Sequence, residues 1–132
     1  MTHIIQQETF TISELATELD ISPSAIRFYE EKGLISPART SGNQRLYTKH
    51  DRGRLKLILR GKRFGASLAE IAEMVGPAEN EISEKQQIEK SMYYIDRRFE
   101  ELQEQKKEIV IYEEDLISLK RKLRERLKSI SE

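Results

Sequence analysis

The sequence predicts a mainly α-helical protein, in which a small domain that contains a β-hairpin precedes one long helix. Helix-start signals recur through the first part of the chain, and neither glycine nor proline follows Pro77. Beyond that point the apolar residues repeat with heptad spacing, which is typical of a coiled coil. We therefore expect a compact domain over residues 1–77 and a coiled-coil dimerisation helix over residues 78–132, with no separate effector domain.

The composition excludes several kinds of chemistry. Charged residues make up 35% of the 132 residues and hydrophobic residues 37%, which leaves room for one small core. The chain has no cysteine, so disulfides, thiolate metal sites and cysteine nucleophiles are excluded, and His3 and His50 do not suffice for a metal site. No apolar run reaches the ~20 residues that span a bilayer, and no signal-peptide core is present. We expect a cytoplasmic protein that is not an enzyme and has no metal, cofactor or membrane partner.

Two short helices open the domain. Residues 11–14 (Thr-Ile-Ser-Glu) have the form of a capping box, and apolar residues follow at helical spacing up to Leu19. Asp20 breaks this helix. Ser22-Pro23 then suits the N-cap and first position of a second helix, which we expect to run to about Lys32. Two such helices joined by a tight turn have the size of a helix-turn-helix.

A hairpin and two further helices complete the predicted domain. Residues 34–47 hold proline, glycine and asparagine between short apolar pieces, which favours a β-hairpin or an extended loop. Residues 48–51 (Thr-Lys-His-Asp) begin a helix that we expect to end at Gly65. Residues 67–70 (Ser-Leu-Ala-Glu) form another capping box and open a short helix that ends at Gly76-Pro77.

The last helix begins at the capping box of residues 83–86 (Ser-Glu-Lys-Gln). Lys106 interrupts its apolar seam, which predicts a change in winding or a helix break at that position. A continuous helix would span roughly 70 Å, and its seam is too long for the small domain to cover, so we expect a second copy of the chain to pair with it. The expected interface residues are Ile88, Met92, Ile95, Phe99, Leu102, Ile109, Tyr112, Leu116, Leu119 and Leu123.

The net charge of zero hides three blocks of charge. Residues 22–65 carry eleven basic and three acidic residues, a local charge of +8, so a polyanionic partner is not excluded. Residues 78–115 have a charge of −6 and residues 116–132 a charge of +4. Parallel pairing of the last helix would set the acidic block against itself, so we expect antiparallel pairing.

The second helix has two different faces at 100° per residue. One face carries Ala25, Ile26 and Tyr29 and can pack on the first helix. The other carries Ser24, Arg27, Phe28 and Glu31 and suits a DNA major groove, where Arg27 can donate to guanine. The alternative is that Arg27 pairs with Glu31 on a solvated face. Tyr29 can have its ring in the core and its hydroxyl on a phosphate.

Two other basic groups are candidates for contacts with the DNA backbone. The hairpin carries Arg39, Gln44, Arg45 and Tyr47 around a glycine-containing turn, and such a turn can hold a sugar-phosphate chain. An ordinary polar hairpin is the alternative. Arg60, Lys62 and Arg63 form the second group, which alternatively complements the dipole at the end of a helix.

Several of these runs resemble the N-terminal domain of MerR-family transcriptional regulators. They include residues 10–16 (Phe-Thr-Ile-Ser-Glu-Leu-Ala), 21–35 (Ile-Ser-Pro-Ser-Ala-Ile-Arg-Phe-Tyr-Glu-Glu-Lys-Gly-Leu-Ile), 44–47 (Gln-Arg-Leu-Tyr) and 65–71 (Gly-Ala-Ser-Leu-Ala-Glu-Ile). The resemblance covers about residues 9 to 76. It implies a winged helix-turn-helix, a long antiparallel dimerisation helix, and a homodimer that binds pseudo-palindromic promoters and often activates transcription by bending and undertwisting the DNA.

The resemblance assigns roles to the candidate residues. Arg27, Phe28 and Tyr29 match the Arg-aromatic-Tyr signature of the recognition helix, Arg39 and Arg45 match arginines of the first wing (residues 36–47), and Arg60, Lys62 and Arg63 fall near the second wing. Gln44 stands where the family commonly has an aromatic residue, so we expect that contact to be absent. The metal-sensing and redox-sensing branches need cysteines that this chain lacks. The run Leu-Arg-Gly-Lys-Arg-Phe-Gly (residues 59–65) is more similar to a subgroup that controls branched-chain amino acid or fatty-acid breakdown.

Double-stranded DNA, a second copy of the chain and, through the promoter, RNA polymerase are therefore the expected partners, and the sequence identifies no small-molecule effector. Two alternatives stay open. An architectural or excisionase-like protein would bend DNA without controlling transcription, which a promoter-reporter assay would show. A coiled-coil adaptor would behave alike with DNA and with heparin in gel shifts.

Overall fold

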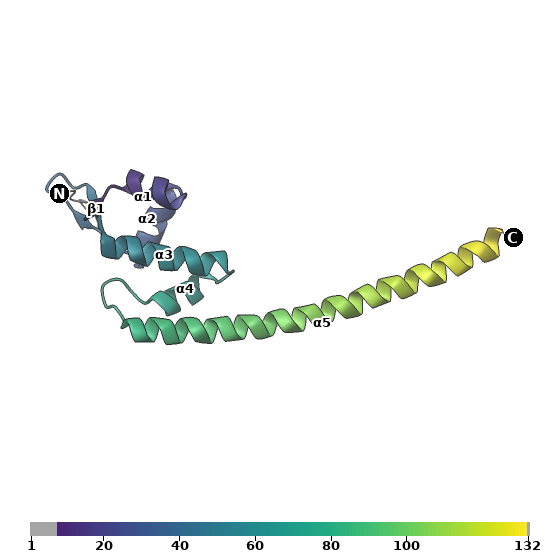
Figure 1. The fold of residues 1–132 in the computed structure, drawn as a ribbon. Coiled ribbons are helices and arrows are strands. Elements are labelled where there is room, and N and C mark those ends of the chain that lie inside the picture. The colour runs from purple at the N-terminus through teal and green to yellow at the C-terminus, as the bar shows by residue number, and fades with distance from the viewer. Residues whose placement is uncertain (1–7, 132) are drawn as a thin grey trace, which may run out of the picture. The chain divides into compact units, whose positions relative to one another are not determined.

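The computed structural model describes residues 8–131 and confirms the predicted fold class, with a small sheet among short helices and one long helix at the end of the chain (Figure 1). His3 lies outside the described residues. Contacts divide the chain into two compact units, residues 1–91 and 92–132, while the domain boundary at residue 77 stays a prediction. The elements are β1 (Thr9–Phe10), α1 (Ile12–Leu19), α2 (Pro23–Glu31), β2 (Ala38–Arg39), β3 (Arg45–Thr48), α3 (Lys49–Arg63), α4 (Leu68–Val75) and α5 (Glu84–Ser131).

Helices α1 and α2 begin where their capping signals lie. The backbone N–H of Glu14 donates to Oγ1 of Thr11 (3.1 Å), and the Glu14 carboxylate accepts from the Thr11 N–H (2.9 Å). Asp20 ends α1 in the left-handed conformation, with φ of 54°. The Ser22 hydroxyl then accepts from the N–H of Ala25 (3.1 Å) and starts α2. Local hydrogen bonds therefore set both ends of the turn between the two helices.

The sheet has three strands in the order β1-β3-β2, with both pairs antiparallel. Strands β2 and β3 are the predicted hairpin, and Arg39 lies opposite Arg45 in its register. Strand β1 was not predicted, because two residues carry no periodic signal and pair only with the distant β3. The hairpin turn closes through the N–H of Thr40, which donates to the carbonyl of Gln44 (2.8 Å).

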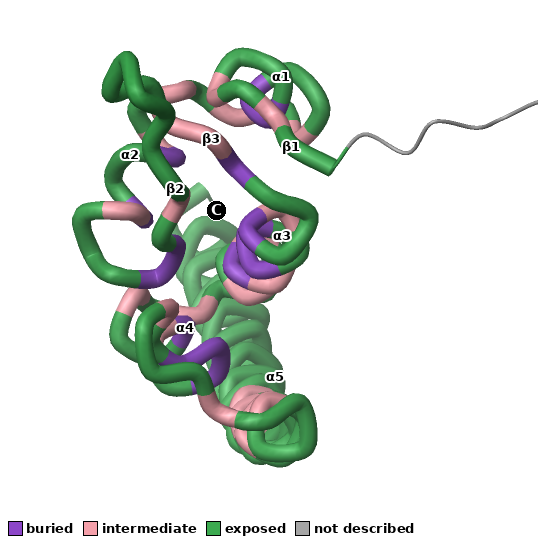
Figure 2. Tube along the Cα trace, turned by 90° about the vertical axis from the view of Figure 1, so that its left-hand side faces the viewer, coloured by how far each residue is buried: buried purple, intermediate pink, exposed green. Residues whose placement is uncertain are grey.

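The core lies where α1, α2, β3, α3 and α4 face one another (Figure 2). The largest fully buried side chains come from α1, α2, the segment after α2, β3 and α3, and these are Leu15, Ile26, Ile35, Tyr47, Leu55 and Ile58. Arg54 of α3 is buried among them. Its Nε donates to the carbonyl of Leu34 (2.8 Å), and its Nη2 donates to the carbonyl of Gly76. Arg54 thus ties the segment after α2 and the end of α4 to α3.

The segment between α4 and α5 is also held by specific contacts. Gly76 has φ of 78°, and a Cβ there would lie 2.9 Å from Cγ1 of Ile82, so only glycine fits this turn. Glu81 accepts from Arg54 (3.4 Å) and contacts His50, and the hydrogen bond with His50 is the main cause that lowers the pKa of Glu81. The side chain of Gln87 donates to the carbonyl of Val75 (2.8 Å), which attaches the first turn of α5 to α4.

Helix α5 runs for 48 residues without a break, so the predicted irregularity at Lys106 does not interrupt it. None of its described residues is buried within the single chain (Figure 2). The predicted seam residues, from Ile88 to Leu123, are all exposed. An apolar stripe of this length in contact with water is unusual for a protein that works as a monomer. Among the described helices, none has both the length and the apolar composition needed to cross a membrane.

Candidate nucleic-acid interface

Helix α2 presents the two faces that the sequence predicts. Ile26 and Tyr29 are buried, with 0% and 5% of their surface exposed. On the other face Ser24, Arg27, Phe28 and Glu31 are all exposed. The buried face holds the helix on the domain, and the exposed face is therefore rigidly presented to a partner.

Arg27 has no ion pair with Glu31 or with any other residue that the structure describes. Its guanidinium is therefore free to donate to a ligand. Next to it, the ring of Phe28 makes an edge contact with Tyr29 (5.6 Å between centroids), and Nζ of Lys32 lies 5.5 Å from the Phe28 centroid. These contacts order the apolar side chain beside Arg27.

Glu30 joins α2 to the wing, a contact that the sequence did not predict. Nε of Arg45 donates to Oε2 of Glu30 (2.5 Å), and Nη2 of Arg39 lies 3.5 Å from Oε1 of the same carboxylate. Nη1 of Arg39 also donates to the carbonyl of Asn43 at the tip of the turn (3.1 Å). The hydrogen bond to Glu30 is the main cause that raises the pKa of Arg45 above its ordinary value. No sequence pattern marks this pairing, because the partners are 9 and 15 residues apart.

Two residues predicted to contact DNA, Tyr29 and Tyr47, have buried rings, as expected for the ring of Tyr29. Tyr47 is fully buried, and its hydroxyl has no hydrogen-bond partner among the described residues. Burial, with a smaller contribution from the Glu30 carboxylate, raises the pKa of Tyr47 to about 12. Tyr29 is nearly as buried. The structure therefore places both rings in the core, beneath the exposed face of α2 and the hairpin of β2 and β3. Gln44, in contrast, lies exposed in the turn.

The second basic group lies at the end of α3. Arg60, Lys62 and Arg63 are exposed in its last turn, and the guanidinium of Arg63 lies 5.7 Å from the centroid of Phe64. Two other arginines of the basic segment make contacts within the domain. Arg52 pairs with Glu18 of α1, which lowers the pKa of Glu18 chiefly through that hydrogen bond, and Arg54 is buried.

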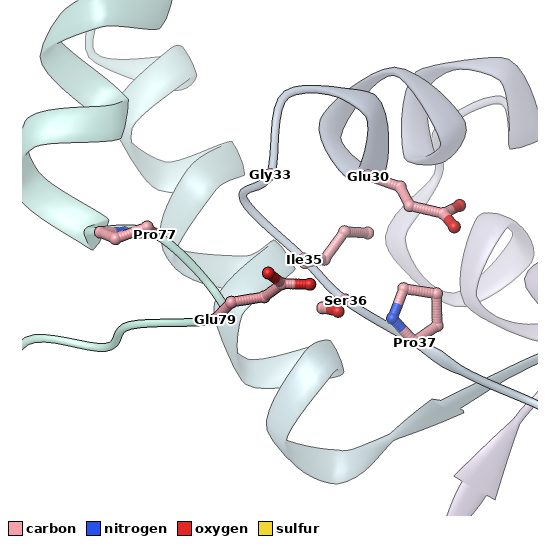
Figure 3. Close-up of a pocket in the computed structure, with 7 residues that line it drawn as sticks. All are labelled: Glu30, Gly33, Ile35, Ser36, Pro37, Pro77 and Glu79. Atoms are coloured by element: carbon pink, nitrogen blue, oxygen red, sulfur yellow. The ribbon is translucent and has the colours of Figure 1, made fainter.

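A shallow pocket of about 360 Å³ lies behind the wing, between the segment after α2 and the segment after α4 (Figure 3). It is lined by Glu30, Gly33, Ile35, Ser36, Pro37, Pro77 and Glu79. In the view of Figure 3 the side chain of Ile35 lies between those of Glu30 and Glu79. Within residues 8–131, no group of three or more histidine and acidic side chains is arranged to hold a metal ion.

Known proteins are similar to this chain in sequence and in fold. Residues 10–76 match the family of MerR HTH regulatory proteins, and residues 52–129 match the family described as MerR, DNA binding. The HTH-type transcriptional regulator CueR of Escherichia coli O157:H7 is 33% identical over 104 residues, which cover 75% of this chain and 77% of CueR.

Two solved structures have the same architecture. A MerR-family transcriptional regulator from Bacillus cereus is 30% identical, with a TM-score of 0.57 over 77% of this chain and 72% of its own. The regulator PbrR691 from Ralstonia metallidurans CH34, solved in complex with lead(II), is 27% identical, with a TM-score of 0.62 over 85% of this chain and 86% of its own. Two family matches, a shared fold and a regulator more than 30% identical lead to one conclusion: the chain belongs to the MerR family of DNA-binding transcriptional regulators.

Proposed function

We propose that this regulator binds a pseudo-palindromic promoter site as a homodimer and controls transcription by distorting the DNA. The observation that carries the proposal is the exposed Arg27, which has no partner among the described residues and lies on a helix whose opposite face is fixed in the core. An unpaired guanidinium on a helix that is fixed in this way can donate two hydrogen bonds to the O6 and N7 atoms of guanine in the major groove.

The contacts to DNA divide into two kinds. Arg27 and Ser24 on α2 read base edges, and the wing and the end of α3 hold phosphates through Arg45, Arg60 and Lys62. Tyr29 and Tyr47 support this surface from below. Because phosphate contacts release counterions, affinity falls steeply as the salt concentration rises.

The homodimer forms along α5, with the seam residues of two copies packed against each other. The exposure of every seam residue in the single chain supports this pairing, since a second helix would remove the apolar side chains from water. An antiparallel arrangement sets the basic end of one helix beside the acidic half of the other. It also holds two copies of α2 apart, so that each can enter its own half-site.

The orientation of the two helices can be measured directly. The chain has no cysteine, so Ser129→Cys gives a single attachment point for a spin label. Antiparallel helices place the two labels on the order of 60 Å apart or more, and parallel helices place them within about 20 Å. A short distance in pulsed electron-spin measurements would overturn the antiparallel arrangement.

The amino-acid composition limits the kind of effector site that the chain can form. PbrR691 was solved with lead(II), but these 132 residues contain no cysteine, so we infer that no thiolate metal site forms within them. The effect on RNA polymerase through the promoter, the cytoplasmic location and the subgroup linked to branched-chain amino acid or fatty-acid breakdown remain predictions from the sequence.

Promoter binding and promoter control are tested together. The purified protein is titrated against duplexes from the region upstream of its own gene, with heparin as competitor, while a reporter carries the bound fragment in cells. We expect a protected site with two-fold symmetry and a change in reporter output. Binding without any change in output would favour the architectural alternative, and equal displacement by heparin and by every duplex would favour the adaptor.

A further inference from the structure

We propose that Glu30 is a positioning residue for DNA binding: its carboxylate holds the guanidinium of Arg45 with the outer edge turned towards a phosphate. The inference rests on the proposed contact between the wing and the DNA backbone. It assigns a favourable role to an acidic side chain within a surface that binds a polyanion.

Arg45 binds Glu30 through Nε and not through its two amino groups. Arg45 uses Nε to reach Oε2 of Glu30 (2.5 Å), and its Nη1 and Nη2 atoms have no partner among the described residues. Those two amino groups can donate side by side to the oxygens of a phosphate, an arrangement that gives the strongest charge-assisted hydrogen bonds.

Arg39 is held differently by the same carboxylate. Its Nη2 lies 3.5 Å from Oε1 of Glu30, and its Nη1 donates to the carbonyl of Asn43. Two of the five N–H groups of Arg39 are therefore used within the protein, one on each amino group. Arg39 holds the turn of the wing, whereas Arg45 keeps both of its amino groups for the DNA.

The position of Glu30 makes it a rigid support. It lies on α2 directly after the buried Tyr29, and its side chain is only 20% exposed. A long arginine side chain that is fixed before binding loses less rotamer entropy when it meets a phosphate. The contact also couples the wing to the recognition helix, so that both approach the duplex in one register.

If Glu30 acted only through its negative charge, its removal would have the opposite effect on DNA affinity. Removing a negative charge near the phosphates reduces repulsion and strengthens binding. The sign of the change in affinity therefore separates a positioning role from mere proximity.

The test compares Glu30→Gln with Glu79→Gln on the same duplex at fixed salt, by fluorescence anisotropy. Glu79 is an exposed acid that lines the same pocket as Glu30, has no partner among the described residues and lies outside the proposed contact surface, so it reports the effect of charge alone. We expect Glu30→Gln to weaken binding about fivefold or more, while Glu79→Gln leaves affinity unchanged or raises it. Equal strengthening by both variants would overturn the proposal.

Two further variants make the assignment specific. In an Arg45→Gln background, Glu30→Gln should no longer weaken binding, and a loss that persists there would also overturn the proposal. Arg45→Lys keeps both the charge and Glu30, so it remains informative if Glu30→Gln fails to fold. We expect Arg45→Lys to bind DNA several-fold more weakly, because lysine lacks the two parallel amino groups of the guanidinium. Unchanged affinity would contradict the proposed contact between Arg45 and a phosphate. If the wild-type protein binds no duplex at all, the proposed function is wrong. If it binds but the variants behave otherwise than expected, only the positioning role of Glu30 is wrong.

Discussion

The arginines of the basic segment differ in how much of their charge is available to DNA. Arg39 and Arg45 share Glu30, Arg52 pairs with Glu18, and Arg54 is buried. Arg27, in contrast, has no partner among residues 8–131. The local charge of +8 therefore overstates the free positive charge, and a few residues carry most of the expected recognition.

At the scale of single residues, we first predict the effect of removing the Arg27 guanidinium. Arg27→Ala should weaken binding to the specific site by ~1–3 kcal/mol and relax the preference for one base pair, because a two-donor contact to guanine is lost. Lys62→Ala at the end of α3 is the control: it removes a proposed phosphate contact and should weaken binding equally on all sequences. Both are measured by anisotropy with specific and scrambled duplexes. A footprint that stays the same in Arg27→Ala would remove Arg27 from the contact surface.

The hydroxyl of Tyr47 provides a second prediction. Because that buried hydroxyl has no partner among the described residues, Tyr47→Phe should leave the free energy of unfolding unchanged or raise it by up to about 1 kcal/mol. Tyr47→Ala, which also removes the ring, should cost about 3–5 kcal/mol. Urea denaturation measures both. A marked loss of stability in Tyr47→Phe would show that the hydroxyl is bonded in solution.

At the scale of elements, α3 organises the domain through one buried side chain. Arg54 donates to carbonyl groups that follow α2 and α4, and it also reaches Glu81 in the segment that leads into α5. Burial lowers the pKa of Arg54, but its three acceptors compensate the charge. The helix therefore fixes three loops that no periodic pattern in the sequence connects.

We predict that Arg54→Ala destabilises the domain by roughly 3 kcal/mol, because it leaves two buried carbonyl groups without a donor. Arg52→Ala, two residues earlier on α3, breaks an exposed ion pair and should have a much smaller effect. Thermal and urea unfolding compare the two variants. Equal losses would contradict the role given to Arg54.

At the scale of the whole molecule, the exposed apolar stripe of α5 makes function depend on a second copy. We predict that Leu116→Asp dissociates the dimer, because a charge within the seam loses its hydration on pairing. DNA affinity should then fall by more than tenfold, since a monomer engages one half-site only. Sedimentation velocity and anisotropy measure the two effects.

Ser118→Asp provides the matched control for that variant. It places the same charge two residues away, on a different face of the same exposed helix. We expect a dimer with unchanged affinity. A dimer that persists in Leu116→Asp would exclude Leu116 from the interface.

Local signals in the chain were sufficient for the helices and for the two faces of α2. Capping boxes such as Thr11–Glu14 act within four residues, and the heptads after Pro77 need no information from elsewhere in the chain. Strand β1, the shared carboxylate of Glu30 and the three acceptors of Arg54 depend instead on partners 9 to 39 residues away. Packing alone brings such groups together, because contacts between distant segments leave no periodic trace in the sequence. For the same reason the sequence marked Tyr47 only as a candidate contact with the DNA backbone, and only the folded domain showed that its ring belongs to the core.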